Sequence, residues 1–308
     1  MKKVLALIPG NNKGKFIVKG FTEAFRKLSF FVYEMKAADL DIDKINKISP
    51  NIIFMFHQNP SEDFFKDSTL DADFIHCAEY LENIPQYAQN QSRHFIFSGN
   101  SKNKKNKYIQ PVSAADYKTS FERYKYNITF AGNPAYENRE IILSELVKNF
   151  GVINIFCPSY NFYKSLDEIR QKKLLDSRYI KLYQLSYRGY VSNQKELADI
   201  YASSKVNIDI QSAEPKDINY RLLEITASGG FIEAPYSKTL IKQYDNGRDI
   251  ETYKNMPELI DKTAFYLKNT GLAQIISANG RNNTVSNFSY YDRLKTMLKA
   301  AYGRDFNS

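Results

Sequence analysis

The sequence has no tryptophan and, in 308 residues, only three histidines and two cysteines. Two cysteines, Cys77 and Cys157, are too few for a disulfide framework and favour a reducing compartment such as the cytoplasm. Neither lies in a Cys/His pattern that would indicate nucleophilic catalysis. His76 and His94 have no Cys or His neighbour at zinc-binding spacing, which argues against a zinc site.

Long hydrophobic runs are also lacking. The longest apolar stretches, such as residues 52–56, are far shorter than the roughly 20 residues that a membrane-spanning helix needs. The apolar run at residues 4–8 is too short for the hydrophobic region of a secretory signal and lacks a small-residue cleavage site. We therefore expect a first strand there and a cytoplasmic protein without a transmembrane segment.

The composition is that of a globular protein with a basic surface. Hydrophobic residues make up 43% and charged residues 25%, and 308 residues are enough for two domains. Lys and Arg total 43 against 34 Asp and Glu, a formal charge of +9. Such a balance favours anionic partners, among them nucleotide phosphates, acidic polysaccharide, nucleic acid and anionic membrane surfaces, without choosing among them.

The hydrophobic pattern predicts an α/β fold in two halves. Apolar or β-rich runs alternate with amphipathic helical stretches, and this order is typical of parallel strands joined by right-handed crossovers. Predicted strands cover residues 4–9, 30–35, 51–56, 94–97, 127–131, 152–157, 206–210 and 231–234. Predicted helices include residues 16–28, 78–81, 137–150, 196–203, 221–228, 257–267 and 291–302.

This pattern indicates two Rossmann-like, doubly wound domains that face each other across a cleft. We expect the first domain at residues 1–117, the second at 118–285, and a C-terminal helix at 286–308 that packs back on the first. Ligands of open α/β sheets bind outside the carboxyl ends of the strands. The functional site is therefore expected between the domains.

The strongest local pattern runs from Asn219 to Ile232, NYRLLEITASGGFI. A helix N-terminus attracts phosphate, and Arg221 in its first turn adds a planar fork for two phosphate oxygens. Glu224, one turn later, is suited to accept hydrogen bonds from a ribose diol. The pattern alone equally describes a surface helix with an ion pair and a glycine C-cap.

Two features of the first half are further candidates. The turn that begins at Gly10, GNNKG, follows the first strand. It either lines the cleft, where it would approach phosphates or a second substrate, or simply connects strand to helix. It does not match a dinucleotide-binding or Walker motif. His57 follows the strand at residues 51–56, where it would serve as a general base or bind a sugar, or be an uninvolved loop residue.

The Asn219–Phe231 segment, N-x-R-x-x-E-x-x-A-x-G-G-F, resembles the donor-site segment of group 1 glycosyltransferases. The nearest subset is the family named after the spore-maturation protein CgeB, which has the GT-B fold. Three further segments agree in order, so that the resemblance covers about residues 125–300. They are ITFAGN with Arg139, GYV followed by ELADIYASSKVNI, and FSYYDR near the end.

The resemblance implies transfer of a sugar from a nucleoside-diphosphate donor, with UDP-sugars favoured, to a glycan or protein acceptor. The second domain would bind the donor and the first the acceptor. Glu224 matches the glutamate that holds the ribose, and Asn219, Tyr220 and Arg221 lie where the diphosphate is approached. In the segment that opens the second domain, Gly132 and Asn133 form the turn, and Arg139 is a second phosphate contact or a solvated helix residue.

Two positions depart from the family pattern. The first acid of the common Glu-x7-Glu pair would fall at Lys216, and Glu214 and Asp217 are out of register. The closing histidine is Phe288. Both departures affect what the resemblance implies about recognition of the transferred sugar. Neither removes the expected nucleotide site.

No cofactor or metal is expected. The leaving diphosphate must be stabilised by a metal or by preorganised cations and helix dipoles. The Asp-x-Asp spellings at Asp39, Asp41, Asp43, Asp71 and Asp73 do not follow strand ends convincingly, and Asp41 and Asp43 look like acids of a helix N-terminus. Metal-independent transfer with Arg221 is therefore the expectation, as in the family resembled.

Two alternatives stay open. A DNA-modifying glycosyltransferase would use the net charge and the lysines of residues 102–107 on nucleic acid, although that segment also reads as a solvated loop. A non-catalytic module that binds nucleotide sugars would explain Lys216 and Phe288.

Overall fold

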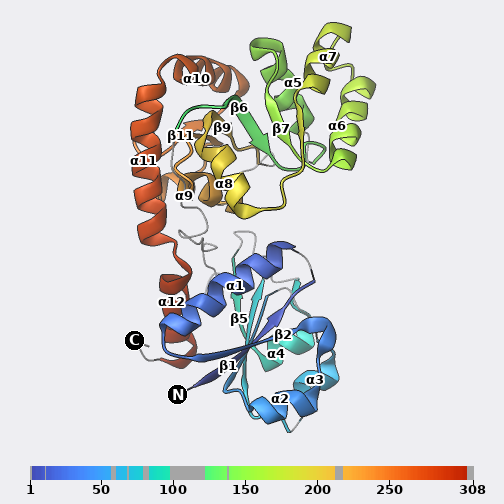
Figure 1. Ribbon diagram of the computed structural model, residues 1–308, viewed down its shortest axis with the longest axis vertical. Helices are drawn as coiled ribbons and strands as arrows, with labels where there is room; N and C mark the ends of the chain where they lie inside the picture. The colour runs from blue at the N-terminus through green and yellow to red at the C-terminus, as the bar shows by residue number, and fades with distance from the viewer. Residues whose placement is uncertain are drawn as a thin grey trace. The chain divides into compact units, whose positions relative to one another are not determined.

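The computed structural model describes residues 2–10, 12–56, 60–67, 69–78, 83–97, 122–136, 139–211 and 218–303. The chain divides into two units. One is Met1–Val112 together with Phe288–Ser308, and the other is Ser113–Asn287. Each unit is built on one parallel sheet (Figure 1).

The first sheet has the strand order β2-β1-β3-β4-β5 with every pair parallel. Its strands are β1 (Lys3–Ile8), β2 (Phe31–Lys36), β3 (Ile52–Phe56), β4 (Asp73–Ala78) and β5 (Arg93–Ile96). The helices of this unit are α1 (Asn12–Lys27), α2 (Ile42–Ile48), α3 (Glu62–Lys66), α4 (Gln86–Gln91) and α12 (Tyr290–Tyr302). The prediction of a helix from Ala78 is wrong at that residue, which ends β4 as a buried strand position.

Helix α12 shares the core of the first unit although it comes last in the chain. Ser289 caps its start by accepting a hydrogen bond from the Asp292 amide at 3.1 Å. The ring of Tyr290 lies edge-on to Phe21 of α1, with centroids 5.0 Å apart. Gly20 of α1 leaves room for that ring, because a Cβ there would overlap it. Figure 1 shows the two helices side by side.

The second sheet has the order β11-β10-β9-β6-β7-β8, again with every pair parallel. Its strands are β6 (Tyr126–Ala131), β7 (Asn154–Phe156), β8 (Tyr187–Gly189), β9 (Ser204–Ile208), β10 (Ile232–Pro235) and β11 (Glu251–Tyr253). The helices are α5 (Arg139–Phe150), α6 (Ser159–Gln171), α7 (Ser177–Leu185), α8 (Gln194–Ala202), α9 (Tyr220–Ala227), α10 (Met256–Lys268) and α11 (Thr270–Asn287). The first strand of this unit, β6, is central, and the chain builds outward from it first on one side and then on the other.

Strand β9 shows how the second sheet is covered on both faces. Val206 and Ile208 are fully buried in a core that also contains side chains of α5, α6, α7, α10 and α11. Side chains alternate along a strand, so Asn207 points to the opposite face. Helix α8 contacts β9, and α9 contacts both α8 and β10. The sheet thus has helices on both faces, as a parallel sheet requires.

Candidate functional site

The ends of β6 and β9 lie next to each other at the topological switch point of the second sheet. Here β7 and β8 extend the sheet on one side of β6, and β9, β10 and β11 extend it on the other. The two strands are hydrogen-bonded neighbours although β7 and β8 separate them in the chain. The chain leaves β6 at Gly132 and passes the end of β9 at Asp209. In open α/β sheets ligands bind at the carboxyl edge at such a switch point.

Helix α9 begins at this edge and presents Arg221 in its first turn. Asn219 caps the helix, its Oδ1 accepting a hydrogen bond from the Leu222 amide at 2.8 Å. Arg221 Nη1 donates to Asp209 Oδ1 at 2.9 Å and weakly to the Ile210 carbonyl at 3.4 Å. The Arg221 side chain is 15% exposed, whereas Asp209 is completely buried. Within the part of the chain that the structure describes, both hydrogen bonds of Arg221 use Nη1.

The other side of the Arg221 guanidinium lies against the turn after β6. A Cβ at Gly132 would overlap Arg221 Nη2, and the φ of Gly132, 154°, is one that side-chain-bearing residues rarely adopt. Arg221 Cζ also lies 5.0 Å from the centre of the Phe130 ring, within cation–π range. One guanidinium therefore connects the ends of β6 and β9.

A second guanidinium group lies at the same turn. Arg139, the first residue of α5, donates from Nη1 to the Asn133 carbonyl at 3.2 Å. Its Cζ is 5.0 Å from the Tyr136 ring and 6.0 Å from the Phe130 ring. Asn133 Oδ1 accepts from the Ala135 amide at 3.0 Å and so shapes the turn. Two arginines near one aromatic ring make this edge positively charged.

The remaining candidates on α9 have distinct surroundings. Both polar atoms of the Asn219 side chain bind the protein, because Nδ2 donates to the two carboxylate oxygens of Asp209 at 2.9 and 2.8 Å. Tyr220 and Glu224 are half-buried. Burial raises the pKa of the Tyr201 hydroxyl, and the Glu224 charge raises that pKa further. Glu224 thus lies close enough to the buried Tyr201 to act on it electrostatically.

The structure brings most of the predicted residues together in the second unit. These are Gly132, Asn133, Arg139, Asn219, Tyr220, Arg221 and Glu224. Gly10 belongs to the first unit, where it is exposed after β1, with no atom within 4 Å of the position of an added Cβ. His57, the lysines of residues 102–107 and Lys216 lie outside the described residues.

Asp209 is a site residue that the sequence analysis missed. Its carboxylate accepts from Arg221, from Asn219 and from Gln211 Nε2, the last at 3.0 Å. A charged residue between Ile208 and Ile210, at the end of an apolar strand, is the signal that would have found it. A buried carboxylate must be paired and hydrogen-bonded to offset its desolvation, and these donors do so.

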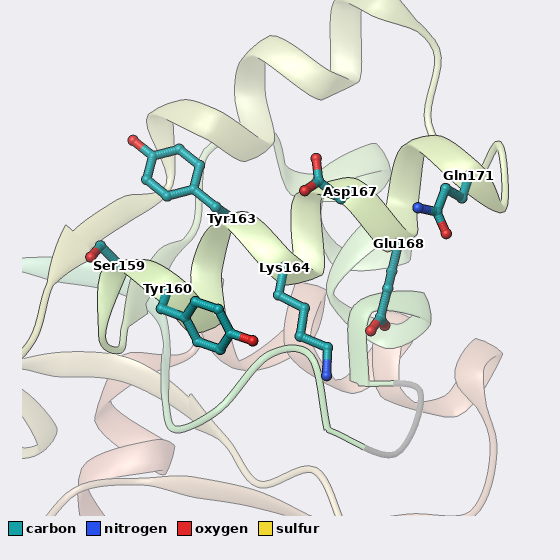
Figure 2. A pocket seen from close by; sticks show the side chains of 7 residues that line it. All are labelled: Ser159, Tyr160, Tyr163, Lys164, Asp167, Glu168 and Gln171. Carbon is teal, nitrogen blue, oxygen red and sulfur yellow. The ribbon is translucent and has the colours of Figure 1, made fainter.

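A separate hollow of about 610 Å³ lies along α6 (Figure 2). In the described part of the chain it is lined only by residues of that helix, Ser159, Tyr160, Tyr163, Lys164, Asp167, Glu168 and Gln171. Two acidic side chains and one lysine give it no excess of positive charge. The two arginines are therefore the better candidate for an anion-binding site.

Two acids of the Asp-x-Asp patterns lie at the start of a helix. Asp41 caps α2, accepting a hydrogen bond from the Lys44 amide at 3.1 Å, and that bond lowers its pKa. Asp43 lies in the first turn, so the prediction that both are acids of a helix N-terminus is confirmed. Among the described residues, no group of three or more His, Cys, Asp or Glu side chains is arranged to hold a metal ion. The helices described include none that is long and apolar enough to cross a membrane.

Solved structures with the same fold include several glycosyltransferases. A glycosyltransferase from Rickettsia africae is 14% identical with a TM-score of 0.66, covering 98% of this chain and 99% of its own. HepE from Anabaena, in complex with UDP, is 9% identical with a TM-score of 0.61, covering 97% and 100%. Sucrose-phosphate synthase from Thermosynechococcus elongatus is 10% identical with a TM-score of 0.62, covering 98% and 100%. The prediction of two parallel-sheet α/β domains of the GT-B type is thereby confirmed.

Sequence similarity identifies the family. No protein of curated function matches the chain significantly. Residues 139–299, just over half of the chain, match the family described as glycosyl transferase-like. The matched region begins at Arg139 and includes all of α9. The prediction that the chain is a glycosyltransferase is confirmed, and the chain belongs to the glycosyl transferase-like family.

Proposed function

We propose that the chain transfers a sugar from a nucleoside-diphosphate sugar, with UDP-sugars favoured, to a glycan or protein acceptor. The observation that carries this proposal is the position of Arg221, which joins the ends of β6 and β9 at the switch point of the second sheet. A guanidinium at a helix N-terminus is suited to bind diphosphate oxygens. The Anabaena protein that shares the fold has been solved with UDP and with UDP-glucose, which supports this donor class.

Each residue of the cluster has a role in this proposal. Arg221 and the N-terminus of α9 stabilise the charge that develops on the leaving diphosphate, with no metal ion required. Arg139 is a second phosphate contact. Glu224, one turn after Arg221, accepts hydrogen bonds from the ribose hydroxyls.

The other predicted residues shape the site or complete it. The turn at Gly132 and Asn133 lets the Arg221 guanidinium approach the backbone closely, since Gly132 has no side chain. Asn219 acts as the cap that starts α9, and Tyr220 adjoins the diphosphate. From the first unit, we assign the acceptor side to the Gly10 turn and to His57 as general base. A cleft between the two domains stays a prediction.

We propose further that the chain is of the CgeB-like subset and acts in the cytoplasm. The Asn219–Phe231 segment supports the first assignment. For the second, Cys77 and Cys157 are free and buried, as in proteins of reducing compartments.

Nucleotide binding tests the proposal directly. The melting temperature of the chain is measured with UDP, ADP and GDP and with their sugars, because a ligand held only by the folded state stabilises it. We expect UDP to raise the melting temperature and at least one UDP-sugar to be cleaved. If no nucleoside diphosphate raises it, the donor site is wrong. Binding without any transfer or hydrolysis would favour a non-catalytic module.

A further inference from the structure

Asp209 makes an unusually complete set of contacts for a residue outside the family motif. It is fully buried and its two carboxylate oxygens accept four hydrogen bonds, from three side chains. Its main chain is also fixed, since its carbonyl accepts from the Tyr253 hydroxyl at 2.8 Å and its amide donates to the Glu233 carbonyl at 2.9 Å. The carboxylate therefore has one position.

We propose that Asp209 is a positioning residue of the donor site, holding Arg221 so that its guanidinium faces the diphosphate at the Gly132 turn. This inference rests on the proposed function. Asp209 does not itself contact the donor, because all of its carboxylate hydrogen bonds go to protein and it is inaccessible to solvent. It acts through the orientation of Arg221.

The way Asp209 engages Arg221 supports this role. It binds Nη1, while Nη2 lies on the side of Gly132. An arginine side chain has many rotamers, and ordering it when a ligand binds costs conformational entropy. Where the side chain is already ordered in the free protein, this cost does not weaken ligand binding. A fixed carboxylate on one edge of the guanidinium selects the rotamer that points its other edge at the turn after β6.

Asp209 also orients the start of α9. The same carboxylate binds Asn219 Nδ2 through both oxygens while Asn219 Oδ1 caps the helix. One buried carboxylate at the end of β9 therefore fixes the positions of the first-turn amides, the cap and Arg221. Loss of the charge on Asp209 would misdirect the phosphate-binding groups and leave the proposed ribose contact of Glu224 in place.

The test compares the affinities for UDP and UMP, whose difference reports the second phosphate. Both dissociation constants are measured by calorimetry for the wild type, Asp209→Asn, Arg221→Gln and the double variant. We expect Asp209→Asn to weaken UDP binding by about tenfold and to leave UMP binding within about threefold, a loss of one charged hydrogen-bond contact. In the Arg221→Gln background, Asp209→Asn should add little, because residues that act through each other are not additive.

The second unit also offers a control acid. Asp245→Asn removes an acid from an exposed pair with Arg248 in the same unit, and should leave both affinities unchanged. Three outcomes would overturn the inference: an unchanged preference of Asp209→Asn for UDP over UMP, an equal loss of affinity for UDP and UMP, or full additivity with Arg221→Gln. In each case, UDP binding by the wild type would still support the donor site. Absence of UDP binding in the wild type would overturn both. If Asp209→Asn does not fold, Asp209→Glu, which displaces the carboxylate by one methylene, must show the same selective loss.

Discussion

Asp209 Oδ1 and Arg221 Nη1 are 2.9 Å apart at the topological switch point of the second sheet. Asp209 is completely buried, and only 15% of the Arg221 side chain is exposed. Removing one partner from such a pair leaves a desolvated charge without compensation. The residue proposed to bind the diphosphate therefore also stabilises the fold, and the two contributions have to be measured separately.

Arg221→Ala is expected to lower the free energy of unfolding by about 3 kcal/mol, since it leaves the buried Asp209 carboxylate with only the neutral donors of Asn219 and Gln211. Arg248→Ala removes the cation of the exposed pair with Asp245 and should change it by less than about 1 kcal/mol. Urea unfolding of both variants checks the difference. Equal effects would show that the Asp209–Arg221 pair is not buried in solution.

The turnover rate of Arg221→Ala tests whether Arg221 acts on the leaving diphosphate. Where Arg221→Ala remains folded, we expect it to reduce sugar transfer far more than nucleoside affinity, because the arginine acts on the leaving diphosphate and not on the nucleoside. Initial rates with a UDP-sugar and the affinity for uridine are the two measurements. Unchanged turnover would remove Arg221 from the site.

Glu224→Gln is expected to abolish the rise in melting temperature that UDP causes, because the neutral amide is a weaker acceptor for two ribose hydroxyls. The ligand-free protein should melt within about 2 °C of the wild type, since Glu224 is half-buried and no core packing is removed. Glu196→Gln, an exposed acid on the neighbouring helix α8, is the matched control. A full UDP-induced shift in Glu224→Gln would exclude this glutamate from the ribose site.

Much of the second unit was predictable because its signals are local. The run at residues 206–210 and the Gly229–Gly230 pair mark the elements that flank α9, and the helix predicted at 221–228 is observed as Tyr220–Ala227. Arg221 and Glu224 were selected as candidates by their positions in that helix and by the resemblance of the Asn219–Phe231 segment, and their roles stay predictions. Helices α6, α7 and α11 were not predicted. In α11, four asparagines and two glycines weaken the apolar periodicity. Helix α6 buries Phe162, Leu166 and Ile169 on one face, so its periodicity was available in the sequence and was overlooked.

The pairing of Arg221 with Asp209 was not predictable in the same way. It depends on strand order, which places β9 beside β6, and on the Asn219 cap, which sets where α9 starts. The sequence shows a free arginine at a helix N-terminus. The structure shows that one edge of its guanidinium is already bound to protein and only the other faces the turn after β6.

Gly132→Ala is expected to impair the donor site without removing a charge. An added Cβ would overlap Arg221 Nη2, and the φ of 154° adds backbone strain, so the guanidinium must move. UDP affinity should fall by about tenfold or more while the chain stays folded, since displacements of about 1 Å at such sites have large effects. Gly271→Ala, where a Cβ meets no atom within 4 Å, is the control. Wild-type UDP affinity in Gly132→Ala would contradict the contact between the turn and Arg221.

Two acids lie side by side in the interior of the second unit. Glu233 of β10 and Glu251 of β11 are paired in register, and Glu233 is completely buried. Lys262 Nζ donates to Glu251 Oε1 at 3.0 Å, whereas Glu233 Oε2 accepts only from the Thr263 hydroxyl at 2.5 Å. Within the described residues, Glu233 Oε1 has no partner. Burial, and then the Glu251 charge, raises the pKa of Glu233 from 4.5 to about 8.

The stability of the second unit should therefore fall as the pH rises from about 4.5 to about 8. Below this range Glu233 is neutral in both states. Within it Glu233 ionises in the unfolded chain but stays neutral in the folded interior, because burial disfavours the charge. Glu233→Gln keeps the shape and stays neutral, so at pH 8.5 its free energy of unfolding should exceed that of the wild type by about 5 kcal/mol, and at pH 5 by less than about 1 kcal/mol. Urea unfolding at pH 5, 6.5 and 8.5 measures this difference, and all three histidines of the chain lie before residue 95, outside this unit. Parallel pH profiles for the two proteins would show that Glu233 is ionised in the folded state.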